Sequence, residues 1–149
     1  MYGTDKLPYI KHLEDVYNVM VEYGISDIDL LVASYLHDII EDTTKSYNDI
    51  KKEFGMEVAE LVYVVTDELG RNRKERHEKT YPKLQQNGKA IILKLADRIA
   101  NLKHSSSTNN GDMLWMYGKE YKDFRNALFS HGGLVTMWQF LDDLFEYKS

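Results

Sequence analysis

The 149-residue sequence contains no cysteine and only two prolines. Without cysteine the chain forms no disulfide, offers no thiolate ligand to zinc and has no cysteine nucleophile. Few prolines favour long regular elements, because proline interrupts helices and central strands. No apolar run approaches the roughly 20 residues that a membrane-spanning helix needs, and residues 1–6 show no secretory pattern. We therefore expect a soluble, cytoplasmic protein.

The charge and length limit the class of protein further. A net charge of −5 argues against general affinity for nucleic acid or an anionic membrane. The length fits one domain with one core, so we expect a single domain over residues 1–149. These numbers leave the oligomeric state open.

The spacing of apolar residues predicts helices throughout, and hence an all-α fold. We expect helices at about 8–23, 30–40, 47–54, 56–67, 90–103, 112–129 and 134–147. Ser26 followed by Asp29 resembles a helix N-cap with an acidic residue at N3. Small polar residues at 105–111 predict a loop. Trp115 and Tyr117 are expected to pack in the core.

Polar residues stand out where the pattern predicts burial. His37 and Asp38 lie late in the most apolar predicted helix, and Glu41 and Asp42 follow within about one turn. A buried carboxylate is costly unless it is paired or bound to a metal. Three carboxylates so close together repel one another unless a cation is present. A divalent metal is the simplest explanation.

Two residues from other helices complete a candidate metal site. His12 lies at the edge of the first apolar stripe, and Asp97 is flanked by core residues. With His37 and Asp38 they would form a mixed imidazole and carboxylate site. Such ligands suit manganese, iron, zinc, magnesium or cobalt more than a soft metal. Water bound to the metal would become a nucleophile near neutral pH, oriented or deprotonated by the two acids one turn further on.

Four segments resemble the RelA/SpoT-type hydrolase branch of the HD superfamily. Residues 37–43, His-Asp-Ile-Ile-Glu-Asp-Thr, resemble its central motif, and residues 8–12, Pro-Tyr-Ile-Lys-His, resemble the segment of its first histidine. Residues 94–102, Lys-Leu-Ala-Asp-Arg-Ile-Ala-Asn-Leu, resemble its last metal-binding segment. Residues 54–59 match the stretch between them. The order and spacing agree as far as about residue 105.

This resemblance implies an all-helical HD domain with one divalent metal, usually manganese. It implies four metal ligands, which are His12, His37, Asp38 and Asp97. Glu41 and Asp42 would be the catalytic acids, and Asn101 would contact a small-molecule nucleotide. The implied reaction is removal of the 3′-pyrophosphate from guanosine tetra- or pentaphosphate, as in small alarmone hydrolases of the stringent response.

Further substrate contacts are predicted from charge and helical spacing. Lys94 and Asn101 share a face with Asp97, and His104 lies one turn beyond them. The basic segment 71–79 has two readings, a solvated helix face or a phosphate-gripping element. Arginine suits bidentate phosphate contacts. For the second reading the candidates are Arg73, Lys74 and Arg76.

The substrate has alternatives. The family usually carries an Arg-Lys pair before its first histidine, whereas the corresponding place here reads Gly3-Thr4-Asp5-Lys6, with Lys6 as its one cation. An HD-type nucleotidase or (deoxy)nucleoside triphosphatase with another nucleotide substrate is therefore a second hypothesis. A third is a catalytically silent nucleotide-binding module.

Overall fold

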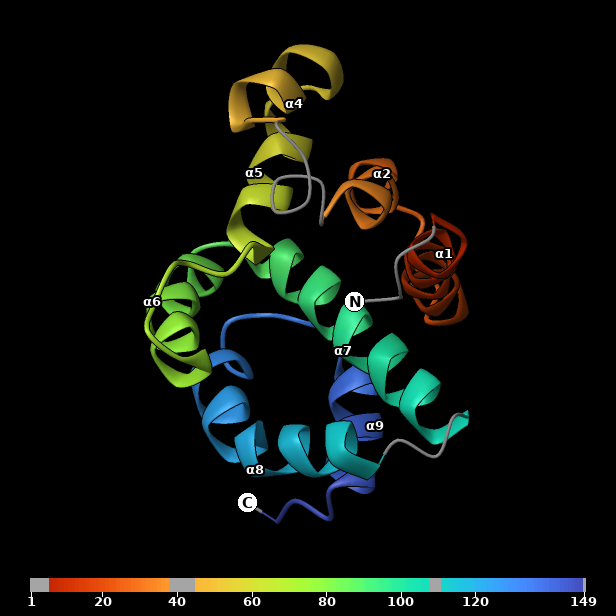
Figure 1. Ribbon diagram of the computed structural model, residues 1–149, viewed down its shortest axis with the longest axis vertical. Helices are drawn as coiled ribbons and strands as arrows, with labels where there is room; N and C mark the ends of the chain where they lie inside the picture. Colours follow the sequence, from red (N-terminus) through yellow and green to blue (C-terminus); the bar gives the residue numbers. More distant parts are fainter. Residues whose placement is uncertain (1–5, 38–44, 108–110, 149) are drawn as a thin grey trace.

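A computed structural model describes residues 6–37, 45–107 and 111–148, and over these ranges the chain contains helices and no strand. The helices, labelled as in Figure 1, are α1 (Lys6–Glu22), α2 (Ile28–Leu36), α4 (Tyr47–Phe54), α5 (Met56–Val65), α6 (Arg73–Gln85), α7 (Gly88–Ser107), α8 (Gly111–Leu128) and α9 (Val135–Leu144). The predicted all-α fold is confirmed. None of the described helices is long and apolar enough to span a membrane.

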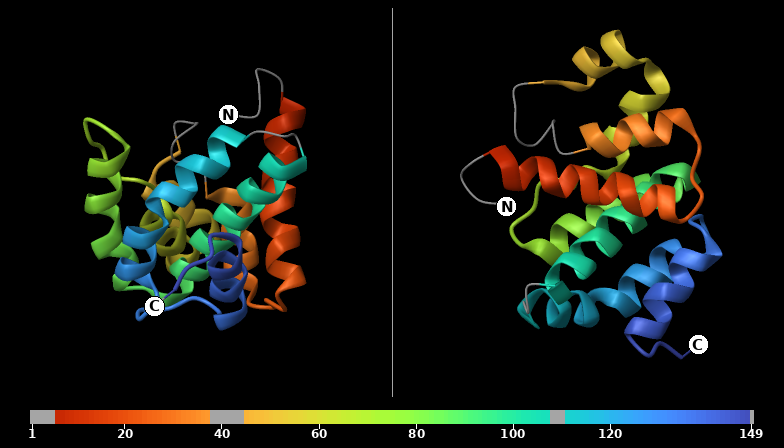
Figure 2. Two further views of the ribbon diagram at one scale, coloured as in Figure 1. Left: turned by 90° about the horizontal axis from the view of Figure 1, so that it is seen from below. Right: turned by 90° about the vertical axis from the view of Figure 1, so that its right-hand side faces the viewer.

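Helix α7 runs through the middle of the molecule. It packs against α1, α2, α5, α6, α8 and α9. Figures 1 and 2 show α1 and α2 on one flank of α7, with α6 and α8 on another. A helix with neighbours on several sides buries apolar residues on more than one face, and Ile91, Leu93, Leu95 and Ile99 are accordingly fully buried. A polar residue in the middle of α7 is therefore held at the centre of the fold.

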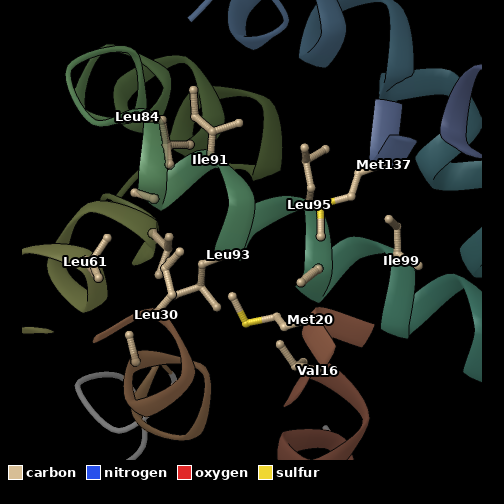
Figure 3. Close-up of a cluster of buried hydrophobic side chains, with 14 of the residues drawn as sticks. Val16, Met20, Leu30, Leu61, Leu84, Ile91, Leu93, Leu95, Ile99 and Met137 are labelled. Atoms are coloured by element: carbon tan, nitrogen blue, oxygen red, sulfur yellow. The ribbon is translucent and has the colours of Figure 1, made fainter. Parts of the chain in front are cut away.

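The core that holds α7 in place is drawn in Figure 3. Val16 and Met20 of α1, Leu30 of α2 and Leu61 of α5 gather around Leu93, and all five are almost completely buried. Burying one such side chain contributes about 1.5–3 kcal/mol. This packing fixes α1 and α2 against α7, and the predicted ligands His12, His37 and Asp97 belong to these helices or their caps.

Two glycines allow the C-terminal part of the chain to lie against the start of α7. A Cβ atom on Gly132 would stand 2.7 Å from the Cα atom of Gly88. Gly133 has φ +91°, and a Cβ there would stand 2.5 Å from a methyl group of Leu95. The indole of Trp138 donates a hydrogen bond of 2.9 Å to the Gly132 carbonyl. Only glycine permits this close approach.

The boundaries of α2 and α7 differ from the prediction. The N-cap of α2 is Asp27, whose carboxylate accepts the backbone N–H of Leu30 at 3.1 Å, so the expected cap at Ser26 is wrong by one residue. Helix α7 continues to Ser107 and α8 begins at Gly111, so the predicted loop at 105–111 is wrong at both ends; positions 108–110 lie outside the described residues. Small polar residues favour loops but do not forbid a last helical turn.

Helices α8 and α6 show where the apolar pattern misleads. Trp115 is 66% exposed rather than in the core, because α8 turns a different stripe inward. That stripe consists of Tyr117, Tyr121, Phe124 and Leu128. The polar segment 71–79 becomes helical from Arg73 onward, and α6 buries His77 and Thr80 before Leu84. The buried face of α6 is thus partly polar, and apolar spacing alone does not predict such a helix.

Candidate metal centre

Three predicted ligands come together from three helices. His12 belongs to α1, His37 is the C-cap of α2, and Asp97 lies in the middle of α7. The Oδ1 atom of Asp97 lies 3.1 Å from His12 Nε2 and 3.0 Å from His37 Nε2. The two imidazole rings are 5.7 Å apart, and all three ligand atoms lie within 4.8 Å of one another. The fold therefore builds a cluster from residues as much as 85 positions apart.

The hydrogen bonds of His37 test whether this cluster suits a cation. His37 Nδ1 lies 2.8 Å from the Ser34 carbonyl oxygen, which accepts hydrogen bonds and cannot donate them, so Nδ1 carries a proton. In the neutral ring Nε2 then presents a lone pair to the Asp97 carboxylate. Two acceptors so close need a proton or a cation between them. Ligand atoms about 3 Å apart also suit neighbouring positions around an ion with bonds of about 2.1 Å.

The charge of the Asp97 carboxylate also suits a site for a cation. Burial alone would raise the pKa of its carboxyl, but His12 and His37, which hydrogen-bond to it when their Nε2 atoms carry a proton, outweigh burial and hold this pKa well below its usual range. The carboxylate is therefore ionised at neutral pH. Both histidines are buried, whereas the Asp97 side chain is 23% exposed. Solvent reaches the cluster on the aspartate side.

The other half of the predicted centre lies outside the described residues. Asp38, the fourth predicted ligand, follows His37 directly in the sequence, and Glu41 and Asp42 come three and four residues after Asp38. Their roles stay predictions, as does metal binding itself. The described residues supply two imidazoles and one carboxylate, a donor set that divalent transition metals bind readily.

The predicted substrate contacts on α7 lie next to the cluster. The Asn101 amide donates to the hydroxyl of Tyr117 on α8, at 3.1 Å. The Lys94 amine lies 3.8 Å from Asp67 Oδ1. His104 lines a cavity of about 280 Å³ between α1 and α7. Since Lys94, Asn101 and His104 fall three, four and seven residues from Asp97, they continue one side of the same helix.

The basic candidates on α6 have different surroundings. Arg73 is paired with Glu120 of α8 through two hydrogen bonds. Its guanidinium also lies 5.5 Å from the ring centre of Tyr117. Lys74 is exposed and Arg76 is half-buried. Of the three, Arg73 is the one that the structure ties to the residues around Asn101.

A charged cluster lies beside Lys94, between the end of α5 and helices α6, α7 and α8. Its members are Asp67, Arg73, His77, Lys94, Arg98 and Glu120. Asp67, Arg98 and Glu120 were not among the site residues predicted from the sequence. Glu120 carries a signal that would have revealed it, because it lies among Tyr117, Tyr121 and Phe124 on the inward stripe of α8. A charge within an apolar stripe indicates a buried partner.

His77 should make the stability of the fold depend on pH. Its pKa is lowered from 6.5 to about 4, mainly by burial and also by the charges of Lys94 and Arg73. The carboxylates of Asp67 and Glu120, each with an oxygen 3.9 Å from the ring, act in the opposite direction but do not outweigh burial. His77 is therefore protonated near pH 6.5 in the unfolded chain but only near pH 4 in the folded chain. The contribution of neutral His77 to the free energy of unfolding is complete above pH 6.5. It falls as the pH drops toward 4, by up to about 3 kcal/mol.

Urea unfolding at pH 7.5 and pH 4.5 measures this effect. The wild-type protein should lose about 2 kcal/mol more than a His77→Gln variant over that interval. The variant is the control for every other group that titrates there. Equal losses in the two proteins would show that His77 does not remain neutral in the folded state.

Together the fold and the cluster define an all-helical protein with a candidate metal centre between three helices. A family model described as an HD domain matches residues 2–115, which is most of the chain. The chain belongs to the HD domain family.

Relatives within this family confirm the resemblance to its RelA/SpoT-type branch. The chain is 37% identical over 98 residues to the guanosine-3′,5′-bis(diphosphate) 3′-pyrophosphohydrolase MESH1 of Drosophila melanogaster. The matched region covers 64% of this chain and 55% of that protein. It is 36% identical over 118 residues to the guanosine-3′,5′-bis(diphosphate) 3′-pyrophosphohydrolase of Aquifex aeolicus, covering 76% of this chain and 15% of that protein. The chain thus spans about half of the first relative and a small part of the second.

A solved structure shows the same fold. It is that of a metazoan orthologue of SpoT, described as hydrolysing ppGpp and as having a role in starvation responses. The TM-score is 0.76 at 29% identity, and the match covers 93% of this chain and 80% of that one. The likeness therefore extends over most of the chain and not only over the ligand segments.

Proposed function

We propose that the chain is a metal-dependent phosphohydrolase that removes the 3′-pyrophosphate from guanosine tetra- and pentaphosphate. The observation that carries this proposal is the convergence of His12, His37 and Asp97 on one point, with their ligand atoms within 4.8 Å. The substrate is inferred from the two curated relatives, both named for this reaction. A cytoplasmic location stays a prediction.

In this proposal the three clustered residues and Asp38 hold one divalent ion, with manganese as the first choice. An ion held by these residues would lower the pKa of a bound water, which would make hydroxide available near neutral pH. The Ser34 carbonyl fixes the proton of His37 on Nδ1 and keeps Nε2 as the ligand atom. The ionised Asp97 contributes the negative charge that the ion requires.

Glu41 and Asp42 are assigned to orient the attacking water and to accept its proton. Removing a proton while the water attacks is general-base catalysis, for which a carboxylate within hydrogen-bonding reach is suited. The water oxygen bonds to the phosphorus attached to the ribose 3′-oxygen, and the bond between that phosphorus and the 3′-oxygen breaks. The 3′-oxygen leaves with a proton, which gives GDP and pyrophosphate from ppGpp.

The face of α7 beside Asp97 is the proposed substrate site. Lys94 and Arg73 would neutralise phosphate charge, and Asn101 would donate to the nucleotide. Lys74 and Arg76 stay candidates with weaker support. The cavity of about 280 Å³ between α1 and α7 is the proposed place for part of the nucleoside, with His104 in its wall.

A substrate panel tests the proposal. Protein loaded with Mn²⁺ is incubated with ppGpp, pppGpp, GDP, GTP and deoxynucleoside triphosphates, and released pyrophosphate and phosphate are measured. Pyrophosphate should appear with ppGpp and pppGpp. GDP is the matched control, because it differs from ppGpp only by the 3′-pyrophosphate.

Each other outcome selects one of the alternatives. Turnover of other nucleotides without turnover of ppGpp would identify an HD-type nucleotidase or triphosphatase. Binding of ppGpp without turnover of any nucleotide, in protein shown to contain metal, would identify a silent binding module. Either result would overturn the proposed reaction.

A further inference from the structure

Glu120 of α8 lies between two arginines that belong to two other helices. Its Oε1 atom lies 3.2 Å from Nη2 of Arg73 on α6 and 3.7 Å from Nη1 of Arg98 on α7. Its second oxygen accepts the Nε–H of Arg73. One carboxylate therefore serves two guanidinium groups, and it links the basic helix α6 to the helix that carries Asp97.

The two arginines differ in their freedom to move. The Arg98 side chain is 3% exposed, and its guanidinium carbon lies 4.6 Å from the ring centre of Tyr117 and 4.0 Å from that of Phe124. Its Nη1 atom has no hydrogen-bond partner among the described residues. The Arg73 side chain is 36% exposed. If the carboxylate were lost, the repulsion between the two cations would displace Arg73 toward solvent, because Arg98 is confined by the rings.

The pairing with Glu120 also sets the orientation of the Arg73 guanidinium group. A side-on pair through Nε and Nη2 uses two of the five N–H donors of a guanidinium, so three remain for an anion. The same pair keeps the Arg73 guanidinium near Tyr117, whose hydroxyl is held by Asn101 one turn after Asp97. Arg73 is thereby presented to the proposed substrate site with its end-on donors unused by Glu120.

We infer that Glu120 is a positioning residue, which holds Arg73 in place for a phosphate group of the substrate. The inference rests on the proposed function in so far as it assigns a phosphate to Arg73. It goes beyond that function because Glu120 touches no substrate and acts through Arg73 alone. A neutral residue in its place would leave two cations unbalanced, so the negative charge is the property that matters.

A double-mutant cycle of Glu120→Ala and Arg73→Ala tests this. The KM and kcat for ppGpp and the Kd for inorganic pyrophosphate are measured in Mn²⁺-loaded proteins. Glu120→Ala should raise KM and Kd about tenfold, which corresponds to about 1.4 kcal/mol, and change kcat less than twofold. In the Arg73→Ala background the same change should have almost no effect, because residues that act as one unit are not additive.

Controls separate positioning from folding. Asp123→Asn removes an exposed charge from the same helix and should leave KM and Kd unchanged. Melting temperatures are recorded for every variant, and Glu120→Gln, which keeps the size but not the charge, replaces the alanine variant if that variant fails to fold. Additive effects in the cycle, or a fall in kcat at constant KM, would overturn the inference.

The pyrophosphate measurement distinguishes failure of this inference from failure of the proposed function. If the wild-type protein does not hydrolyse ppGpp, the proposed reaction is wrong, but the cycle on pyrophosphate affinity still decides the role of Glu120. A non-additive loss of affinity supports it and an additive loss refutes it. Absence of pyrophosphate binding by the wild-type protein would refute it as well.

Discussion

Replacement of Asp97 by asparagine is expected to remove the metal from the protein and to lower its turnover of ppGpp about a thousandfold or more. A bound metal contributes several kcal/mol of transition-state stabilisation, and about 1.4 kcal/mol corresponds to a factor of ten in rate. Asp97 Oδ1 is the atom that both histidines approach, at 3.1 and 3.0 Å. The amide keeps the shape of the side chain but not its charge, so the two buried imidazoles and the predicted ligand Asp38 would have to hold the ion without it.

Metal content per chain and initial rates measure this effect in the same preparations. Asp123→Asn is the matched control, because it makes the same chemical change at an exposed position of α8 and should retain both metal and activity. A full complement of metal in the Asp97→Asn protein would show that the cluster of His12, His37 and Asp97 is not the metal centre.

The second large effect is expected at Glu41 and Asp42, where turnover should be lost while the metal stays. General acid–base catalysis contributes about 10²–10⁴ in rate, so Glu41→Gln and Asp42→Asn should each lower kcat by about that factor. Their carboxylates are assigned to the water and not to the ion, so metal content should stay at the wild-type level. This combination distinguishes them from Asp97, whose replacement should remove both.

Rates under saturating Mn²⁺ and metal analysis of the same samples measure this prediction. Glu53→Gln is the control, since it neutralises an exposed acid on α4, the next described helix. Unchanged kcat in both variants would refute the assigned mechanism. Loss of metal in either variant would instead make that residue a ligand.

The helices were predictable where burial is apolar and local. The pattern in residues 47–54 predicts α4 with the bounds that the structure has, because Ser46 and Asp49 form a capping box and Gly55 ends the helix. Apolar spacing did not predict α6, since its buried residues include His77 and Thr80, which contact polar groups of Asp67, Glu68 and Glu120. Apolar spacing records contact with a core but not the pairing of polar groups.

The candidate site likewise contains residues that could be predicted from the sequence and residues that could not. His12, His37 and Asp97 were found because polar residues within apolar helices are conspicuous, and the structure brings these three together. The link from Arg73 through Glu120 to Arg98 was not found, because it joins residues of three helices by side-chain contacts that no local pattern encodes. The extent of the domain, the metal and the substrate contacts stay predictions.

The separation of the ligands along the chain has a mechanical consequence. His12 is 85 residues from Asp97, and His37 is 60 residues from it. An ion bound to all three would close two long loops of the unfolded chain, as a disulfide does in proteins that have cysteine. In a chain without cysteine, the metal would thus be a reversible cross-link, tying the N-terminal helices α1 and α2 to the axis of the molecule.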